Sequence, residues 1–179
     1  MREIETRYRV ADPDALLVAL ERAGVALGEA VLQDDQAYAP ADWEPGTPRI
    51  GRTFCRLRTQ DGLHVFTTKT PTADPREHTE HETAVADRGQ MHAAVLRMGY
   101  VPSLRIVKHR RTGVLREMLV CVDEVAHLGV FLELEVVVDD DRDGSAVRAE
   151  LDAWARGLGV RLEHTMETYD ILVRAARGA

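Results

Sequence analysis

The chain has few cysteines, and their spacing excludes two kinds of cysteine site. Among its 179 residues only Cys55 and Cys121 are cysteines, and they form neither a C-x-x-C motif nor a Cys/His ligand spacing. The N-terminus has no basic and then apolar leader. We therefore expect a reduced, cytoplasmic protein.

Long hydrophobic runs and an excess of positive charge are also lacking. The longest apolar runs have the length of a strand, so we expect no membrane-crossing helix. The formal net charge of -7 argues against nucleic-acid binding, although a local basic pocket can hold a phosphate in an acidic protein. No internal repeat appears, and the length fits one domain, which we expect to span residues 1–179.

What the chain does have is charged residues of like sign placed two positions apart. Five stretches carry such a pair, three acidic and two basic: Glu3 and Glu5, Arg56 and Arg58, Glu80 and Glu82, Lys108 and Arg110, Glu133 and Glu135. Residues i and i+2 of a strand share a face, and in the clearest strands the intervening residues are apolar. A solvated antiparallel sheet gives the same alternation. Segregation of sign over several strands instead favours a pocket for a metal and a polyanion.

Hydrophobic periodicity and turn residues predict an α+β fold. We expect strands over residues 3–10, 31–39, 53–59, 63–70, 78–85, 105–113, 114–123 and 131–138, and helices over 13–24, 87–98, 145–158 and 166–176. Eight strands joined by short links suggest an eight-stranded antiparallel β-barrel. Its apolar face would point out to the helices and its interior would be polar, forming a water-filled tunnel.

The charged pairs suggest the chemistry of such an interior. Carboxylates on adjacent strands can converge on a hard cation such as Mg²⁺ or Mn²⁺. Arginine forks and lysine ammonium groups suit phosphate oxygens, and Arg7 and Lys69 have the same phase as their charged neighbours. Metal and cationic donors together stabilise a phosphoryl group during transfer, so phosphoryl or nucleotidyl transfer is the predicted reaction class.

At this point the residues resemble a family. Glu3-Ile4-Glu5-Thr6-Arg7 is similar to the N-terminal E-x-E-x-K signature of the CYTH superfamily, the triphosphate tunnel metalloenzymes. The other motifs follow in the family's order: Arg56-Leu57-Arg58, Lys69, Glu80-His81-Glu82, Lys108 with Arg110, Asp123, Leu128-Gly129, Glu133 with Glu135, and Thr168-Tyr169. The departure is Arg7, where the family usually has lysine.

The resemblance implies a role for each of these residues. It implies a single CYTH domain with an eight-stranded tunnel, and an enzyme activity that depends on Mg²⁺ or Mn²⁺. The metal side would comprise Glu3, Glu5, Glu133, Glu135, Asp123, Glu80 and Glu82. The triphosphate side would comprise Arg7, Arg56, Arg58, Lys69, Lys108 and Arg110. Glu5, Lys69 and Glu133 are the residues we expect to be catalytic.

The family contains more than one activity, and the alternatives stay open. We expect a metal-dependent phosphohydrolase acting on a small triphosphate-bearing substrate such as inorganic, nucleoside or thiamine triphosphate. A class IV adenylyl cyclase that converts ATP to cyclic AMP and pyrophosphate is the first alternative. Gln33, Asp35 and Tyr38 in an early strand are similar to that branch. A non-catalytic protein that binds polyphosphate or nucleotides is the second alternative. Whether the protein forms a homodimer also stays open.

Three further signals are interpreted as structural. Residues 139–150 satisfy the EF-hand calcium-loop pattern, but a strand and not a helix precedes them. We therefore expect an acidic strand-to-helix link, and a strand-loop-helix calcium site stays open as the alternative. His78 and His81 have H-x-x-H spacing but lie on opposite faces of a strand, so we expect surface residues. Tyr38, Trp43 and Trp154 are expected to be core or loop anchors, with Trp43 also able to cover a tunnel mouth.

Overall fold

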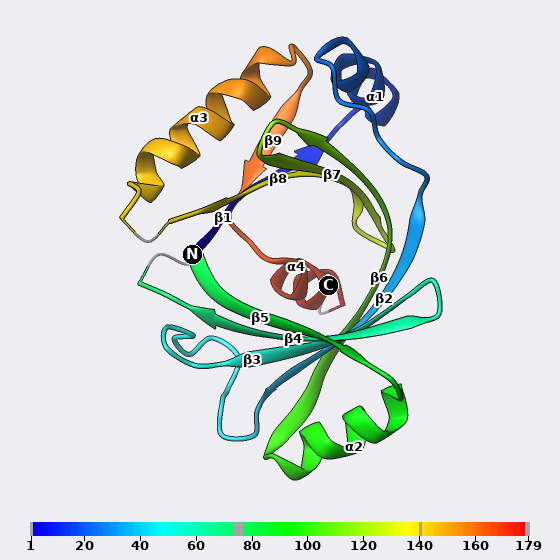
Figure 1. Cartoon of the computed structure of the whole chain (residues 1–179), viewed down its shortest axis with the longest axis vertical. Helices are drawn as coiled ribbons and strands as arrows, with labels where there is room; N and C mark the ends of the chain where they lie inside the picture. Colours follow the sequence, from blue (N-terminus) through cyan, green and yellow to red (C-terminus); the bar gives the residue numbers. More distant parts are fainter. Residues whose placement is uncertain (1, 74–76, 140, 178–179) are drawn as a thin grey trace. The chain divides into compact units, whose positions relative to one another are not determined.

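The computed structural model describes residues 2–73, 77–139 and 141–177. These residues form two compact units (Figure 1). Unit 1 comprises Met1–Val31 and Lys108–Ala179, and unit 2 comprises Leu32–Val107. That the two form a single domain stays a prediction.

Unit 1 is an antiparallel sheet with three helices. Its strands follow the order β6-β7-β8-β1-β9, of which β6 contributes its C-terminal half. The elements are β1 (Arg2–Val10), α1 (Pro13–Arg22), β6 (Tyr100–Leu115), β7 (Met118–Val125), β8 (Gly129–Val138), α3 (Gly144–Gly157), β9 (Leu162–Thr165) and α4 (Tyr169–Arg177). In Figure 1, α1 and α3 lie on one face of β1 and β8, and α4 lies on the other.

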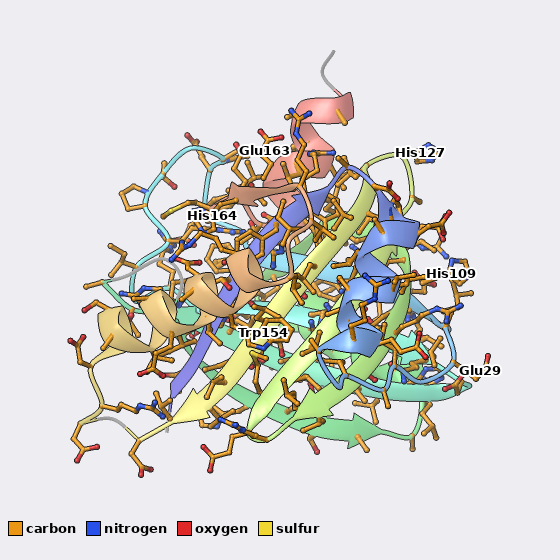
Figure 2. All side chains as sticks on the ribbon, turned by 90° about the horizontal axis from the view of Figure 1, so that it is seen from above. Glu29, His109, His127, Trp154, Glu163 and His164 are labelled. Carbon is orange, nitrogen blue, oxygen red and sulfur yellow. The ribbon has the colours of Figure 1, made fainter. Side chains whose placement is uncertain are left out.

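The face beneath α1 and α3 is the apolar one. Ile4 of β1 and Leu134 of β8 are fully buried there, with Leu16 of α1 and Val147 of α3 in the same cluster. Trp154 of α3, labelled in Figure 2, packs against that cluster, which confirms its predicted role as a core anchor. The opposite face is left to the charged residues, as the alternation predicts.

Side-chain caps fix where the unit 1 helices begin. Asp12 Oδ1 accepts from the Ala15 backbone N–H at 3.0 Å, and Pro13 occupies the first helical position of α1. Asp143 Oδ1 accepts from the Ser145 N–H at 2.9 Å at the start of α3. This cap supports the strand-to-helix interpretation of the acidic stretch, although its Asp140 lies outside the described residues.

Unit 2 is also an antiparallel sheet, in the order β5-β4-β3-β2-β6. It contains β2 (Val31–Pro40), β3 (Phe54–Gln60), β4 (Leu63–Pro71), β5 (Glu77–Val85), α2 (Arg88–Arg97) and the N-terminal half of β6. Asp61 and Gly62 both have positive φ, at 51° and 75°, as a tight hairpin turn between β3 and β4 requires. Tyr38, Leu57 and Val95 form a small core between the sheet and α2, so Tyr38 is a core anchor as predicted.

The described elements differ from the expected ones in several places, and two of them concern the sheet of unit 1. The hairpin between β6 and β7 turns at Arg116, which has φ of 57°, three residues beyond the expected break at Gly113. Gly113 instead lies within β6, where a Cβ would meet the Ala26 carbonyl oxygen at 2.7 Å. Strand β9, unexpected from the sequence, pairs with β1. Among the described helices none has the length and apolar character needed to span a membrane.

Candidate functional site

In unit 1 the strand register brings the predicted charged residues face to face. Arg7 of β1 lies opposite Glu133 of β8, and Glu5 lies opposite Glu135. On the neighbouring pair, Arg110 of β6 lies opposite Asp123 of β7. Directly opposed residues share a face, so this surface of the unit 1 sheet carries both signs of charge.

Glu133 is the buried centre of this surface. Arg7 Nε donates to Glu133 Oε1 at 2.5 Å, and Arg110 donates to the other carboxylate oxygen. Burial alone would raise the pKa of Glu133. The positive charges of Arg7, Arg110 and Lys108 outweigh burial, so this pKa lies well below its ordinary value.

Asp123, which is fully buried, collects four hydrogen bonds. Arg110 donates to both carboxylate oxygens at 2.6 Å, and Lys108 Nζ donates to Oδ2 at 2.7 Å. The Tyr169 hydroxyl donates to the same oxygen at 2.9 Å. The sequence analysis placed Tyr169 in a family motif but gave it no role. Its buried position on an otherwise charged surface is visible only in the structure.

Arg7 uses the extra donors that distinguish arginine from lysine. Besides Glu133 it binds Glu5 Oε1 at 3.1 Å through Nη2 and the backbone carbonyl oxygen of Glu167 at 2.8 Å through Nη1. Its guanidinium carbon lies 4.3 Å from the centre of the Tyr169 ring. Burial lowers the pKa of Arg7, but Glu133 and Glu5 more than offset this and the net direction is upward. The departure from the family pattern thus ties β1 to the segment that precedes α4.

The remaining acids of unit 1 form a set suited to a hard cation. Glu135 has a pKa raised to about 8, first by burial and then by the charges of Glu133, Glu3 and Glu5, with Arg110 opposing. Glu3 and Glu135 both line a cavity of about 950 Å³. A bound divalent cation would offset the negative charge that raises the pKa of Glu135, and oxygen ligands are those that Mg²⁺ and Mn²⁺ prefer. Glu3 and Glu5 bring carboxylate oxygens within 4.8 Å of each other, so these two acids could share such an ion, with Glu135 as a further carboxylate nearby.

In unit 2 the predicted residues also share one face of the sheet. Arg58 forms a two-pronged pair with Asp35, with both N–H···O distances 2.7 Å. Next along β3, Arg56 Nη2 donates to Thr67 Oγ1 at 3.1 Å and lies 3.5 Å from Glu82 Oε2. Lys69 on β4 pairs with Glu80 on β5. The structure thus groups both arginines, Lys69 and the two predicted acids of β5.

Arg56 is only partly compensated by the charged residues around it. Burial lowers the pKa of Arg56, the neighbouring Arg58 lowers it further, and Asp35, Glu80 and Glu82 do not offset these effects. Its Nε atom is buried and has no acceptor among the described residues. An anion brought in by a ligand would compensate this charge.

His78 corrects one sequence interpretation. It was expected at the surface, but only 7% of it is exposed, because it lies on the charged face of β5 beside Lys69 and Glu80. Lys69 Nζ approaches His78 Nε2 at 3.4 Å, and Glu80 Oε1 lies 3.5 Å from the same nitrogen. His81, on the opposite face, is exposed as expected. The i+2 spacing of His78 and Glu80 was the signal that could have placed His78 correctly.

Comparison with known families identifies the class of this protein. A model of the CYTH domain matches residues 1–169, so the chain belongs to the CYTH domain family. The membership drawn from the ordered motifs is thereby confirmed, and with it the general association with triphosphates and divalent metals that this family carries. A relative from Methanocaldococcus jannaschii named "Putative adenylate cyclase MJ0240" is 26% identical over 164 residues, which are 89% of this chain and 91% of the relative.

Solved structures confirm the fold class. The PH1819 protein from Pyrococcus horikoshii OT3 has a TM-score of 0.80 at 21% identity and covers 97% of this chain and 99% of its own. A Hippeastrum protein described as "Putative adenylyl cyclase HpAC1", with a dominant triphosphatase activity, has a TM-score of 0.67 at 16% identity and covers 97% and 95%. These matches confirm the predicted fold class, the antiparallel β-barrel of the CYTH family. The expectation that all helices pack on the apolar face is wrong for α4, because its Tyr169 lies on the charged face of the unit 1 sheet and binds Asp123.

Proposed function

We propose that this protein is a Mg²⁺- or Mn²⁺-dependent phosphohydrolase that acts on a small triphosphate-bearing substrate. The observation that carries the proposal is the contrast around Arg56. It is a half-buried cation with a buried, unpartnered Nε atom, and its own surroundings leave it undercompensated on a sheet face that also carries Arg58 and Lys69. Such a face suits a ligand with several phosphate oxygens.

The phosphate-binding role falls to the cations. In unit 2, Arg56, Arg58 and Lys69 would donate to phosphate oxygens, and their charge would stabilise the negative charge that develops on the transferred group. In unit 1, Lys108 and Arg110 were assigned the same role. Both already share Asp123, so we propose that they bind phosphate while Asp123 holds them in place.

The metal-binding role falls first to Glu3, Glu5 and Glu135. The predicted set also includes Glu133, Asp123, Glu80 and Glu82. Glu133 and Asp123 are engaged by arginine and lysine, which makes them positioning residues within that set. A bound Mg²⁺ or Mn²⁺ would polarise a phosphoryl oxygen and offset the charge of the acids.

Of the three residues predicted to be catalytic, Glu5 and Lys69 are proposed to act on the reacting atoms and Glu133 to act through the residues it positions. Glu5, a partly exposed carboxylate, would orient the attacking water and accept its proton. Lys69 would neutralise charge on the phosphoryl oxygens as the terminal bond breaks. Glu133, which keeps its negative charge, would act by fixing Arg7 and Arg110.

An assay of three substrates with both metals tests this proposal. Tripolyphosphate, ATP and thiamine triphosphate are incubated with Mg²⁺ or Mn²⁺, and released phosphate is measured beside pyrophosphate and cyclic AMP. We expect phosphate release, with kcat lowered at least about 100-fold in Glu5→Gln. Glu124→Gln, an exposed site on β7, is the matched control and should keep full activity. Absence of turnover with every substrate and both metals contradicts the proposal.

Cyclisation of ATP is the second candidate, and the adenylate cyclase names of the M. jannaschii relative and of solved structures favour it. In that reaction a ribose hydroxyl attacks the α-phosphorus and pyrophosphate leaves. Cyclic AMP formed in equal amount to pyrophosphate would establish it. Tight binding of triphosphates without either product would instead indicate a binding protein. A cytoplasmic location belongs to the same proposal.

A further inference from the structure

Trp43, Arg49 and Phe54 of unit 2 form a stacked cluster that the proposed phosphate chemistry does not use. The Trp43 and Phe54 rings meet edge to face, with centroids 5.2 Å apart and planes at 86°. The guanidinium carbon of Arg49 lies 4.3 Å from the centre of the Phe54 ring and 5.2 Å from that of Trp43. All three side chains are half-buried, so part of the cluster faces solvent.

The cluster lies at one end of the cationic face. Phe54 begins β3 and is directly opposite Lys69 in the register. It precedes Arg56 by two positions, so both side chains point to the same side of the sheet. Equivalent positions on a strand are about 7 Å apart, which leaves room for a sugar between a ring at Phe54 and phosphates at Arg56.

The loop that carries Trp43 and Arg49 is held in place by its own contacts. The Gly51 N–H donates to the Pro71 carbonyl at 2.9 Å, and the Ala41 N–H donates to the Gly99 carbonyl at 2.9 Å. Long loops within compact units are usually functional when they are ordered. An ordered loop also spares a ligand the entropy of organising its own binding surface.

The cluster contains a buried hydrogen-bond donor without an acceptor among the described residues. Trp43 Nε1 is buried and has no hydrogen-bond partner among the described residues. A buried N–H without an acceptor is unfavourable, so ring nitrogens or oxygens of a ligand would be bound there. Aromatic and arginine surfaces bind nucleobases by stacking, because every base presents a flat face.

We propose that Trp43, Arg49 and Phe54 form a subsite for the base of a nucleoside triphosphate. This inference rests on the proposed function in one respect, because Arg56, Arg58 and Lys69 must bind the phosphates of the same molecule. Such a subsite would make the protein bind nucleoside triphosphates more tightly than inorganic triphosphate, because the aromatic cluster would add affinity for the base.

Calorimetric titration with ATP and with tripolyphosphate, both in Mg²⁺, tests the subsite. For Trp43→Ala we expect ATP binding to weaken about 5- to 100-fold while tripolyphosphate binding stays unchanged. Trp43→Phe keeps a ring but lacks the N–H, so it should show a smaller loss for ATP alone. Ile50→Ala is the control, because Ile50 is an exposed residue of the same loop and should alter neither ligand.

Each remaining outcome overturns one proposal or both. Equal weakening of both ligands by Trp43→Ala, or no weakening of either, overturns the subsite and leaves the proposed function intact. ATP binding that depends on Trp43 in a wild-type protein without turnover supports the subsite and overturns the enzymatic proposal. A wild-type protein that binds neither ligand overturns both.

Discussion

Unit 1 and unit 2 each carry ionised residues on one face of an antiparallel sheet, but they treat those charges differently. In unit 1, Lys108, Asp123 and Glu133 are at most 4% exposed, and each is held by an oppositely charged partner. In unit 2, the side chains of Arg56 and Lys69 are 23% and 32% exposed. Arg56 and Lys69 of unit 2 are therefore more accessible than these three residues of unit 1, although the Arg58–Asp35 pair of unit 2 is also largely buried.

The pKa shifts of Arg110 in unit 1 and Arg56 in unit 2 have opposite directions, which reflects how far neighbouring acids compensate each charge. Burial lowers the pKa of Arg110, but Glu133 and Asp123 outweigh it and the pKa rises. Burial and Arg58 lower the pKa of Arg56. A buried ion is tolerated only when its partners replace the water it lost. Unit 1 supplies those partners itself, whereas the charged neighbours of Arg56 in unit 2 do not outweigh its burial.

The largest expected effect concerns the central carboxylate of unit 1. Asp123→Asn leaves the buried Lys108 and Arg110 without their shared anion, so we expect the free energy of unfolding to fall by about 3–5 kcal/mol. Urea denaturation measures the loss. The matched variant in unit 2 is Asp35→Asn, which removes the carboxylate bound by the partly exposed Arg58 and should lower the unfolding free energy by about 1–2 kcal/mol. Equal losses at the two sites would remove the distinction between the units.

The second effect concerns activity, for which we expect a substitution in unit 2 to matter although it changes stability little. Arg56→Gln removes a cation that is poorly compensated, so we expect the free energy of unfolding to change by less than about 1 kcal/mol. The same variant should lower kcat/KM for the triphosphate substrate about 100- to 1000-fold, because a phosphate oxygen loses a charged donor. Steady-state kinetics and urea denaturation on one preparation separate the two effects. Retained activity would place phosphate binding elsewhere.

Much of the fold could be predicted because local signals agreed with one another. Asp12 followed by Pro13 marked the start of α1, and Asp61-Gly62 marked a hairpin, and both lie where expected. The turn predicted at Gly113 is wrong because glycine is typical both of turns and of close backbone approaches, and only the fold shows which applies. β9 was missed because a strand of four residues has too little alternation to detect.

For the site, the sequence predicted which residues of one strand share a face, but not which residues of neighbouring strands lie opposite each other. The i+2 pairs placed Glu133 and Glu135, or Arg56 and Arg58, on one face. Which acid faces which base depends on register, since a shift of one residue exchanges the faces. The hydrogen bond between Tyr169 and Asp123 joins residues 46 positions apart, so no local pattern could indicate it. The role of each residue toward a substrate stays a prediction.

The third effect tests the arginine that replaces the family's lysine. Arg7→Lys keeps the charge but cannot bind Glu133, Glu5 and the Glu167 carbonyl together. We expect the free energy of unfolding to fall by about 1–2 kcal/mol, with loss of protection of the amides around Tyr169 in hydrogen exchange. Arg9→Lys, on the same strand, is the control. If Arg7→Lys leaves the hydrogen-exchange protection of α4 unchanged, the Arg7 guanidinium does not hold the segment that precedes α4.

The smallest effect is a pH dependence confined to unit 1. Glu135 has a folded pKa of about 8 against an ordinary value near 4.5, because burial and Glu133 disfavour its charged form. The fold therefore favours the protonated acid, and its contribution is fully present below the ordinary pKa and lost as pH rises toward 8. In metal-free protein we expect the free energy of unfolding to fall by about 1 kcal/mol per pH unit between pH 6 and 8.

Glu135→Gln isolates this contribution because the amide cannot ionise but has nearly the same shape. The variant should lose the slope between pH 6 and 8 and be more stable than the wild type at pH 8. Mg²⁺ added to the wild type should flatten the same slope, because a bound cation favours the ionised carboxylate. The matched substitution in unit 2, Glu82→Gln, replaces an acid whose side chain is 55% exposed and should leave the slope intact. If Glu82→Gln and Glu135→Gln changed the slope alike, the pH dependence would not arise from the burial that distinguishes unit 1.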